Sequence, residues 1–263
     1  MSKAAQAAAW LVQEHERRER FRPLPPELAP ETPAEAYSIQ EAFVALRAKK
    51  RGAAVGYKIA LSSAAMRRFV GVDSPQAGVL LESTVRRSPA RIRAADYVNC
   101  IIEFEIAVEL ADDLPAADAP FSRQQVAGAV GAVMAALEIA DDRSADYSRL
   151  AQHPLHLIAD NAWNEGAVLG RPVPEWQKLQ LDKLKGIASV NGAHVGEGVG
   201  ADAMGHPLDA VVWIADHLAS RGYSLLRRDV VITGSIVTSK RVKAGDVVRF
   251  ELENLGGVEL RIE

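Results

Sequence analysis

The chain has 263 residues, 48% of them hydrophobic and 25% charged, with a formal net charge of −3 at pH 7. This composition is ordinary for a soluble globular protein of one large domain or two small ones. The charge gives no reason to expect nucleic acid as a partner, no apolar run reaches the ~18 residues of a membrane span, and the single cysteine excludes an internal disulfide framework.

The first part of the chain is expected to be helical. Residues 1–20 read as an Ala-rich helix with a charged end and lack the order of a signal peptide, so we expect a cytoplasmic protein. Five prolines make residues 22–33 an extended connector. Residues 33–52 repeat apolar side chains at helical spacing and end at Gly52, which indicates an amphipathic helix.

Strands dominate the sequence that follows. Residues 53–61 read as a short buried strand, and residues 62–71 as a small helix with Ser62 or Ser63 as its cap. From about residue 78 onward, several further segments have the alternation and the turn residues of strands. They are residues 77–85, 90–99, 101–110, 164–171, 181–200 and 227–237.

Two helical segments and a hairpin complete the pattern. Residues 122–141 are helical at first and close in an apolar segment, and residues 207–222 predict a strong helix. The tail, residues 244–263, reads as a β-hairpin. The fold class is therefore α+β. We expect a helical N-terminal portion, residues 1–75, packed on a mainly antiparallel β-rich core, residues 76–263, in one continuous unit.

The strand "IIEFEIAVEL", residues 101–110, raises the main functional question. Glu103, Glu105 and Glu109 share one face, because side chains on a strand alternate with a period of two. A half-buried strand with a wet polar face explains them without any function. If the face is covered, Glu103 and Glu105, roughly 7 Å apart at their backbones, would repel each other, and a divalent cation would turn this repulsion into binding.

Two lone charges lie in apolar segments elsewhere in the chain. Glu138 stands in "VMAALEIADD", and Lys58 is the only charge in "AAVGYKIALSS". A buried glutamate needs a partner, and a buried lysine pairs with an anion or loses its proton. The alternatives are a solvent edge for Glu138 and, for Lys58, a strand end from which the ammonium group reaches water.

Together, these residues match a metal site built from oxygen ligands. Three carboxylates suit Mg²⁺ or Mn²⁺, and a lysine beside them could bind a substrate carboxylate or shuttle a proton. Zinc would favour histidine or cysteine. His153 and His156 are three residues apart, but Pro154 interrupts any helix there, so we interpret both as structural or surface residues. His206 is expected to open the helix that follows it.

Several segments of the sequence resemble, in the same order, the 2-keto-4-pentenoate hydratase family. They are "PAEAYSIQEAF", "VGYKIALS", "GVDSPQAGVL", "IIEFEIAVEL", "ALEIADDR", "ADNAWNEGAVLG" and "GHPLDAVVWIADHLASRG". This family includes the 2-oxohept-3-enedioate hydratases and the 4-oxalocrotonate decarboxylases, within the fumarylacetoacetate hydrolase superfamily. The resemblance extends from about residue 32 to the end of the chain.

The resemblance implies a fumarylacetoacetate hydrolase-like core, a mixed β-roll or sandwich, with a helical N-terminal portion. It also implies a Mg²⁺ or Mn²⁺ site in which Glu103, Glu105 and Glu138 match the metal ligands. Lys58 and Asp73 match active-site residues that would transfer protons or orient water. Glu109, at the far end of the strand, keeps its interpretation as a solvent-facing residue.

The same resemblance places four residues in the substrate pocket, namely Leu61, Asp160, Asn161 and Trp163. Many relatives carry a serine where Trp163 stands, so we expect the indole to reshape the pocket. Ala60 stands where glycine is common. Lys240 and Arg241 stand where relatives are mostly apolar. They are either exposed or placed to meet a second acidic group of the substrate, and we favour exposure because charged side chains are seldom buried.

The leading hypothesis is a metal-dependent hydratase that acts on an unsaturated 2-oxo acid, such as the one formed from 2-hydroxypenta-2,4-dienoate, in the catabolism of aromatic compounds. A decarboxylase of the 4-oxalocrotonate type is the alternative, because it would use the same ligands and the same enolate. A non-catalytic oxo-acid-binding paralogue is a third hypothesis. A carbon–carbon bond hydrolase is disfavoured. The resemblance implies a homo-oligomer, and a complex with a pathway decarboxylase is a further possible association.

Overall fold

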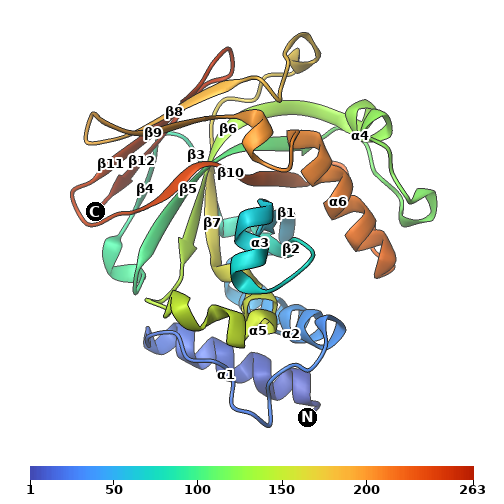
Figure 1. Ribbon diagram of the computed structural model, residues 1–263, viewed down its shortest axis with the longest axis vertical. Coiled ribbons are helices and arrows are strands. Elements are labelled where there is room, and N and C mark those ends of the chain that lie inside the picture. Colours follow the sequence, from blue (N-terminus) through green and yellow to red (C-terminus); the bar gives the residue numbers. More distant parts are fainter.

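Two β-sheets form the body of the computed structural model, which describes all residues from Met1 to Glu263 (Figure 1). The larger sheet has seven strands in the order β2-β1-β10-β5-β6-β7-β3, and the smaller has five in the order β4-β12-β11-β8-β9. The larger sheet contains β1 (Ala54–Ala60), β2 (Gln76–Leu81), β3 (Val85–Arg87), β5 (Cys100–Leu110), β6 (Val130–Asp141), β7 (Asn164–Leu169) and β10 (Val230–Arg241). The smaller contains β4 (Ala90–Ile92), β8 (Lys185–Val190), β9 (Ala193–Val199), β11 (Val247–Leu252) and β12 (Gly256–Ile262).

Helices α1, α2 and α5 lie together at the end of the molecule that carries the N-terminus, whereas α4 and α6 contact each other away from this end (Figure 1). The α-helices are α1 (Lys3–Arg17), α2 (Pro33–Arg51), α3 (Ala64–Val70), α4 (Arg123–Ala129), α5 (Pro154–Ala159) and α6 (Pro207–Ser220). Helix α3 begins at the predicted cap, Ser63, and ends at Gly71, whose φ of 80° favours glycine. No helix combines the length and the apolar character that crossing a membrane requires.

An apolar core between the two sheets occupies one face of β5. Ile102, Phe104 and Ile106 are fully buried in this core, and the Phe104 ring lies 5.5 Å from the ring of Phe250 on β11. Because side chains alternate along a strand, the glutamates of β5 point to the opposite face. The packing of the two sheets therefore decides which face of the larger sheet carries the acidic side chains. The predicted α+β class with a mixed β core and N-terminal helices is confirmed.

Pro154 separates two helical segments, as predicted, since a 3₁₀ helix ends at Gln152 and no single helix carries both His153 and His156. Pro154 is the first residue of α5, a position where the missing N–H of proline costs no hydrogen bond. This helix buries His156, whose Nδ1 accepts a hydrogen bond from the N–H of Leu24 at 3.2 Å. His153 stacks on His156 with ring centroids 5.1 Å apart. His206 caps α6 as predicted, because its Nδ1 accepts the N–H of Leu208 at 3.0 Å.

A buried ionic cluster attaches α1 to the rest of the molecule. His15 of α1 contacts two carboxylates, since its Nε2 lies 2.6 Å from Asp160 Oδ1 and its Nδ1 lies 3.3 Å from Glu165 Oε1. Three arginines also form ion pairs with these two carboxylates. They are Arg143, which pairs with Asp160 at 2.5 Å, and Arg47 and Arg51, which pair with Glu165 at 2.5 and 2.6 Å. Both ring nitrogens of His15 face oxygen atoms, so this geometry favours the imidazolium form.

Stability of the fold is expected to fall as the pH rises past the pKa of His15. Burial alone would lower this pKa, but the carboxylates of Asp160 and Glu165 outweigh burial and raise it above the ordinary 6.5. The cluster is therefore complete below pH 6.5 and loses its central charge as the pH passes the raised value. We expect roughly 1–3 kcal/mol of unfolding free energy to be lost there. Urea unfolding between pH 6 and pH 9 measures this loss. If the free energy of unfolding of a His15→Asn variant fell equally steeply with pH, His15 would not be its cause.

Candidate metal centre and substrate pocket

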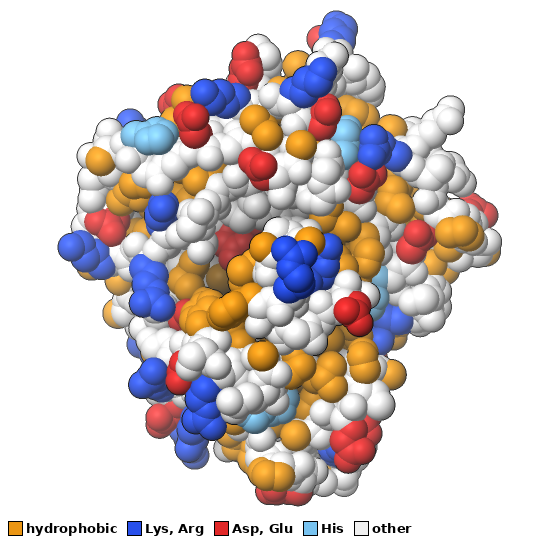
Figure 2. Space-filling view, viewed as in Figure 1, with side chains coloured by type: hydrophobic (Ala, Val, Ile, Leu, Met, Phe, Trp, Pro, Cys, Tyr) orange, Lys and Arg blue, Asp and Glu red, His pale blue; other side chains and the backbone are white.

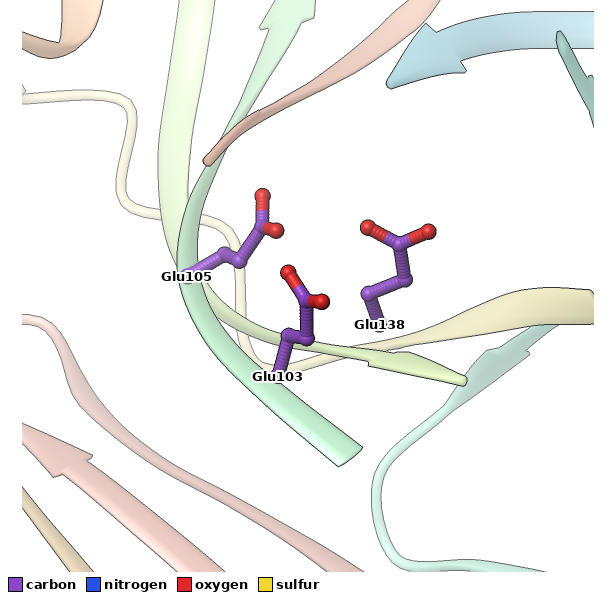
Figure 3. Close-up of side chains that lie close together, drawn as sticks. All are labelled: Glu103, Glu105 and Glu138. Atoms are coloured by element: carbon purple, nitrogen blue, oxygen red, sulfur yellow. The ribbon is translucent and has the colours of Figure 1, made fainter. Parts of the chain in front are cut away.

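Three glutamates converge on one point of the larger sheet (Figure 3). Glu103 and Glu105 come from β5, and Glu138 comes from β6, directly opposite Glu103 in the antiparallel register. One carboxylate oxygen from each lies within 4.8 Å of those of the other two. Figure 2 shows a hollow in this face of the molecule with acidic side-chain atoms at its bottom. The sheet register therefore brings together residues that are more than thirty positions apart in the sequence.

Burial makes this cluster costly in the absence of a compensating charge. Glu105 and Glu138 are completely buried. Burial and the neighbouring carboxylates of Glu138 and Glu103 raise the pKa of Glu105 well above its usual range. Burial also raises the pKa of Glu138 to about 7, although Lys58 opposes the rise. Like charges this close in a region of low dielectric repel strongly, so the site favours an added cation or protonation.

Lys58 lies beside the glutamates, with its Nζ 3.1 Å from Glu138 Oε1. Only 3% of the residue is exposed, so the alternative in which its ammonium group reaches water is wrong. Burial alone would lower the pKa of Lys58, but the carboxylates of Glu138, Glu103 and Glu105 raise it instead. A Cβ atom at Gly78 on the adjacent strand β2 would lie 2.9 Å from Lys58 Cγ, so glycine there makes room for the lysine side chain.

The oxygens of the buried pair fit the requirements of a metal ion. Glu105 Oε2 accepts a hydrogen bond from the N–H of Gly234 at 2.7 Å, and Glu138 Oε1 accepts one from Asn164 Nδ2 at 2.9 Å. The other oxygen of each carboxylate is buried without any hydrogen-bond partner. Buried polar atoms are rarely left without a partner, because no hydrogen bond then offsets the free energy lost when the atom is removed from water. Each carboxylate thus has one oxygen held by the protein and one free for a cation.

Two residues that support the site were not predicted from the sequence. Asn164 and Gly234 hold the carboxylates of Glu138 and Glu105, the kind of support that metal ligands commonly receive from their surroundings. Gly234 has a φ of 101°, and a Cβ atom there would lie 2.6 Å from Ser62 Oγ. The sequence shows a glycine in "ITGS" and an asparagine in "AWNEG", but it does not show that they approach Glu105 and Glu138 across neighbouring strands.

The predicted pocket residues Leu61 and Trp163 lie in one apolar cluster. Trp163 is 8% exposed and packs with partly buried Ala60, the last residue of the strand that carries Lys58, and with Leu61, which follows it. Its ring is edge-on to those of Phe21 and Tyr147, with centroids 5.5 and 6.1 Å away. Its indole nitrogen has no hydrogen-bond partner. The indole therefore packs in an apolar cluster at the end of β1, and its expected effect on the shape of the substrate pocket stays a prediction.

The other predicted pocket residues have structural partners. Asp160 belongs to the ionic cluster with His15. The side chain of Asn161 accepts the N–H of Val79 at 2.7 Å and donates to its carbonyl oxygen at 3.0 Å. These bonds fasten a turn in which three successive residues, Asn161 to Trp163, have φ values of 51°, 49° and 60°. Such conformations are costly for residues other than glycine, so the paired bonds to β2 help to hold Trp163 in place.

Asp73 and Glu109 lie apart from this cluster. Asp73 is exposed and lines a surface groove together with side chains of α2 and α6, and it forms no hydrogen bond or ion pair with the glutamates. Its predicted catalytic role stays a prediction. Glu109 is partly exposed, with Arg87 Nη2 at 3.5 Å from its Oε2. The solvent-facing interpretation of Glu109 agrees with this position.

Truncation of Trp163 is expected to destabilise the protein strongly. Trp163→Ala should lower the free energy of unfolding by about 3–5 kcal/mol, because it leaves a cavity among well-packed aromatic rings. Trp213→Ala is the matched control, since Trp213 is partly exposed on α6 and stacks on His217 alone among the aromatic rings. Urea unfolding measures the loss of unfolding free energy in each of the two variants. A smaller loss for Trp163→Ala than for Trp213→Ala would show that the indole is not packed as described.

Comparison with known proteins identifies the family. A family model described as fumarylacetoacetate (FAA) hydrolase C-terminal matches residues 50–263. A 2-keto-4-pentenoate hydratase of Paraburkholderia phymatum is 32% identical over 223 residues, which cover 85% of this chain and 83% of that protein. A 2-oxo-hept-4-ene-1,7-dioate hydratase of Escherichia coli is 28% identical over 255 residues, which cover 95% of this chain and 94% of the relative.

The fold agrees with a solved structure over almost its full length. The 4-oxalocrotonate decarboxylase from Pseudomonas putida G7, complexed with magnesium and adipate, has a TM-score of 0.90 at 25% identity, and the match covers 99% of this chain and 97% of that one. The resemblance that the sequence motifs indicated is confirmed by the family match, by the named relatives and by this structure. The chain belongs to the fumarylacetoacetate hydrolase family.

Proposed function

We propose that this chain is a divalent-metal-dependent hydratase of an unsaturated 2-oxo acid, with 2-hydroxypenta-2,4-dienoate as the simplest substrate. One observation carries the proposal. Two completely buried carboxylates, Glu105 and Glu138, each keep one oxygen without a partner, beside Glu103 and the buried ammonium group of Lys58. The names of the relatives from Paraburkholderia phymatum and Escherichia coli support hydration as the class of reaction. The sequence resemblance supports a role in the catabolism of aromatic compounds.

The metal would be held by Glu103, Glu105 and Glu138, and it is either Mg²⁺ or Mn²⁺ because both suit carboxylate ligands. When bound, such an ion supplies Lewis-acid stabilisation for negative charge on the 2-oxo oxygen of the substrate. Asn164 and Gly234 orient two of the carboxylates by donating to their other oxygens. The protein therefore fixes the ligands before the substrate arrives, which lowers the cost of reorganisation during the reaction.

Lys58 is the residue best placed to handle protons. Hydration requires a ketonisation, in which the enol oxygen loses a proton and a chain carbon gains one. Water then adds across the conjugated double bond, with its hydroxyl going to one carbon and its proton to the other. Lys58 Nζ holds a proton within the buried site, and its charge also attracts the substrate carboxylate. The apolar cluster around Trp163 limits the water that reaches the reacting carbons. For Asp73, the support is the sequence resemblance.

A decarboxylase of the 4-oxalocrotonate type is the second candidate, favoured by the structural match to the enzyme of that name. The test incubates the Mg²⁺-loaded chain separately with 2-hydroxypenta-2,4-dienoate and 2-hydroxymuconate and identifies the products by NMR. Metal-dependent formation of 4-hydroxy-2-oxopentanoate supports the hydratase, and release of CO₂ from 2-hydroxymuconate supports the decarboxylase. Tight binding of either acid without turnover would favour a non-catalytic oxo-acid-binding protein.

We also propose where the enzyme acts and with which subunits and partners it assembles. The resemblance to the hydratase family supports a cytoplasmic homo-oligomer, and a complex with a pathway decarboxylase is a further proposed association. Light scattering of the purified chain measures the number of subunits, and co-purification with a candidate decarboxylase tests the complex.

A further inference from the structure

We infer that Gln76 binds and orients the water molecule that adds to the substrate. The inference rests on the proposed function and assigns one further residue to its second step, the addition of water. Gln76 is the first residue of β2, the edge strand beside the strand that carries Lys58. Four observations support this role: the face that Gln76 occupies, its burial, its partnerless oxygen and the chemistry of the substrate.

The register places Gln76 on the face of the larger sheet that carries the glutamates. One row of directly opposed residues crosses β2, β1, β10 and β5, and it consists of Gly78, Lys58, Ile232 and Ala107. Side chains in such a row share a face, and so do residues two apart on one strand. Gln76 and Glu105 each lie two residues beyond this row in the same direction. Three strand spacings, roughly 14 Å on a flat sheet, separate their backbones, which leaves room for a small 2-oxo acid and a water molecule between the two side chains.

The amide of Gln76 is covered and fixed in one orientation. The residue is 2% exposed, although it also borders the surface groove beside α2 and α6. Its Nε2 donates to the carbonyl oxygen of Pro154 at 3.3 Å, and the reversed amide would place two acceptors together, so Oε1 faces away from Pro154. The adjacent backbone is held too, since Ala77 donates to the hydroxyl oxygen of Tyr37 at 3.0 Å and accepts from Gln40 Nε2 at 2.8 Å.

The side-chain oxygen of Gln76 is buried without a hydrogen-bond partner. Such an atom has lost its hydration with nothing in exchange, so it points to a ligand. The other buried side-chain atoms without a partner belong to charged residues, except the indole nitrogen of Trp163. Gln76 and Trp163 therefore offer an uncharged acceptor and an uncharged donor, which suit a neutral molecule better than an ion.

The donor of Trp163 belongs to the same region of the sheet. Ala60 lies directly opposite Gln76 and packs against the apolar cluster that contains Trp163. A buried water molecule usually has roughly two to four polar partners. Gln76 can accept a hydrogen bond from such a water, and Trp163 can donate one to it.

The chemistry of the substrate identifies water as the partner of Gln76. Ketonisation leaves an unsaturated 2-oxo acid whose polar groups, a carboxylate and a 2-oxo oxygen, are acceptors that would repel the oxygen of Gln76. Water is the reactant that can donate an O–H group at the far end of the acid. An amide oxygen that accepts this O–H turns the lone pairs of the water towards the double bond.

The addition of water then balances without any proton on Gln76. The water oxygen forms a bond to carbon 4, and the electron pair of the C3=C4 bond moves towards the 2-oxo group. Carbon 3 gains a proton, and the water loses one, which Lys58 carries as in the proposed function. The O–H held by Gln76 stays in the product as its hydroxyl group. Gln76 therefore orients the reacting water, and Lys58 transfers the proton.

The test separates ketonisation from hydration, because only hydration consumes water. The Mg²⁺-loaded chain is mixed with 2-hydroxypenta-2,4-dienoate. Loss of the dienol absorbance above the rate without protein measures ketonisation, and NMR measures the unsaturated 2-oxo acid and 4-hydroxy-2-oxopentanoate. Gln76→Met keeps the length of the side chain but has no carbonyl oxygen, so hydration should slow roughly 10- to 100-fold. Ketonisation should stay within about twofold, and the unsaturated 2-oxo acid should accumulate.

Two further variants of Gln76 make the test specific. Gln76→Glu should keep hydration within roughly threefold of the wild-type rate, because burial favours its protonated form, which can donate to Pro154 and keeps a carbonyl oxygen. Gln76→Asn carries the test if Gln76→Met does not fold. Its amide is shorter, so the oxygen is withdrawn from the water, and hydration should again slow more than ketonisation.

Gln40→Met is the matched control. Gln40 is also a buried glutamine, 4% exposed, but its Nε2 donates to the carbonyl oxygens of Ala77 and Ile158. Its replacement should leave the ratio of hydration to ketonisation unchanged, even if the protein becomes less stable. An unchanged ratio in Gln76→Met, or an equal fall in Gln40→Met, would overturn the inference and leave the proposed function standing. Absence of both steps in the wild-type chain would contradict the proposed function and, with it, this inference.

Discussion

Replacing Glu105 or Glu138 with glutamine is expected to reduce hydration of 2-hydroxypenta-2,4-dienoate by about a thousandfold or more, because each variant loses one of the proposed charged metal ligands and the charge stabilisation that the ion would supply. Glutamine has almost the same size as glutamate. It can still accept the hydrogen bond that Glu105 receives from Gly234 or that Glu138 receives from Asn164. The expected effect is therefore on metal binding and turnover, which kinetic assays and metal titration measure, rather than on folding, which circular dichroism measures.

Glu109→Gln is the control for this prediction. Glu109 lies on the same strand and shares the alternation of Glu103 and Glu105, but it is partly exposed at the far end, close to Arg87. Its replacement should leave both metal affinity and turnover within about twofold of the wild-type values, since isolated surface charges contribute little. If Glu138→Gln bound metal as tightly as the wild-type chain, the assignment of the three glutamates as ligands would be wrong.

Replacing Lys58 with methionine is expected to remove most of the activity while metal binding persists. Methionine keeps the length and the apolar stem of the side chain, which passes over Gly78, but it has no ammonium group. Loss of a proton-transfer group typically lowers the rate by about 10²- to 10⁴-fold. The bound cation would replace the charge that Lys58 offers to Glu138 at 3.1 Å. We therefore expect an unchanged or tighter Kd for Mg²⁺, measured by isothermal titration, together with the loss of turnover.

Two outcomes would contradict this role of Lys58. If Lys58→Met lost the metal as well as the activity, the lysine would be needed to organise the carboxylates rather than to transfer protons. If the variant kept its activity, a different group would have to supply the proton. Lys240→Met offers a matched comparison, because it removes a lysine from a neighbouring strand on the opposite face of the sheet and should change neither quantity.

The glutamates and the lysine could be predicted from the sequence because each stands out in its local pattern. Glu103 and Glu105 follow the period of a strand, and Lys58 and Glu138 are lone charges in apolar segments. Burial of a charge needs a partner, so such positions draw attention without any knowledge of the fold. The supporting groups break no pattern. Asn164 and Gly234 act only because β6, β7, β5 and β10 are neighbours in the sheet.

Other details depended on tertiary context in the same way. His15 is an ordinary residue of an amphipathic helix, and its role became visible only where α1 meets Asp160 and Glu165. Pro154 separates two helical segments, but the local sequence does not show that it begins a helix that buries His156. The sequence favours exposure for Arg241, and its side chain is mostly exposed, but the register of β10 also places it on the face that carries the glutamates. Local sequence does not contain the register.

The most direct test of the account measures turnover against bound metal in the same sample. Metal-free protein is titrated with Mn²⁺, the bound ion is quantified by electron paramagnetic resonance, and hydration of 2-hydroxypenta-2,4-dienoate is followed by NMR. We expect no hydration without metal and a rate that rises in proportion to occupancy until one ion is bound per chain. Full activity in the metal-free protein, or an unchanged rate and occupancy in Glu105→Gln, would contradict it.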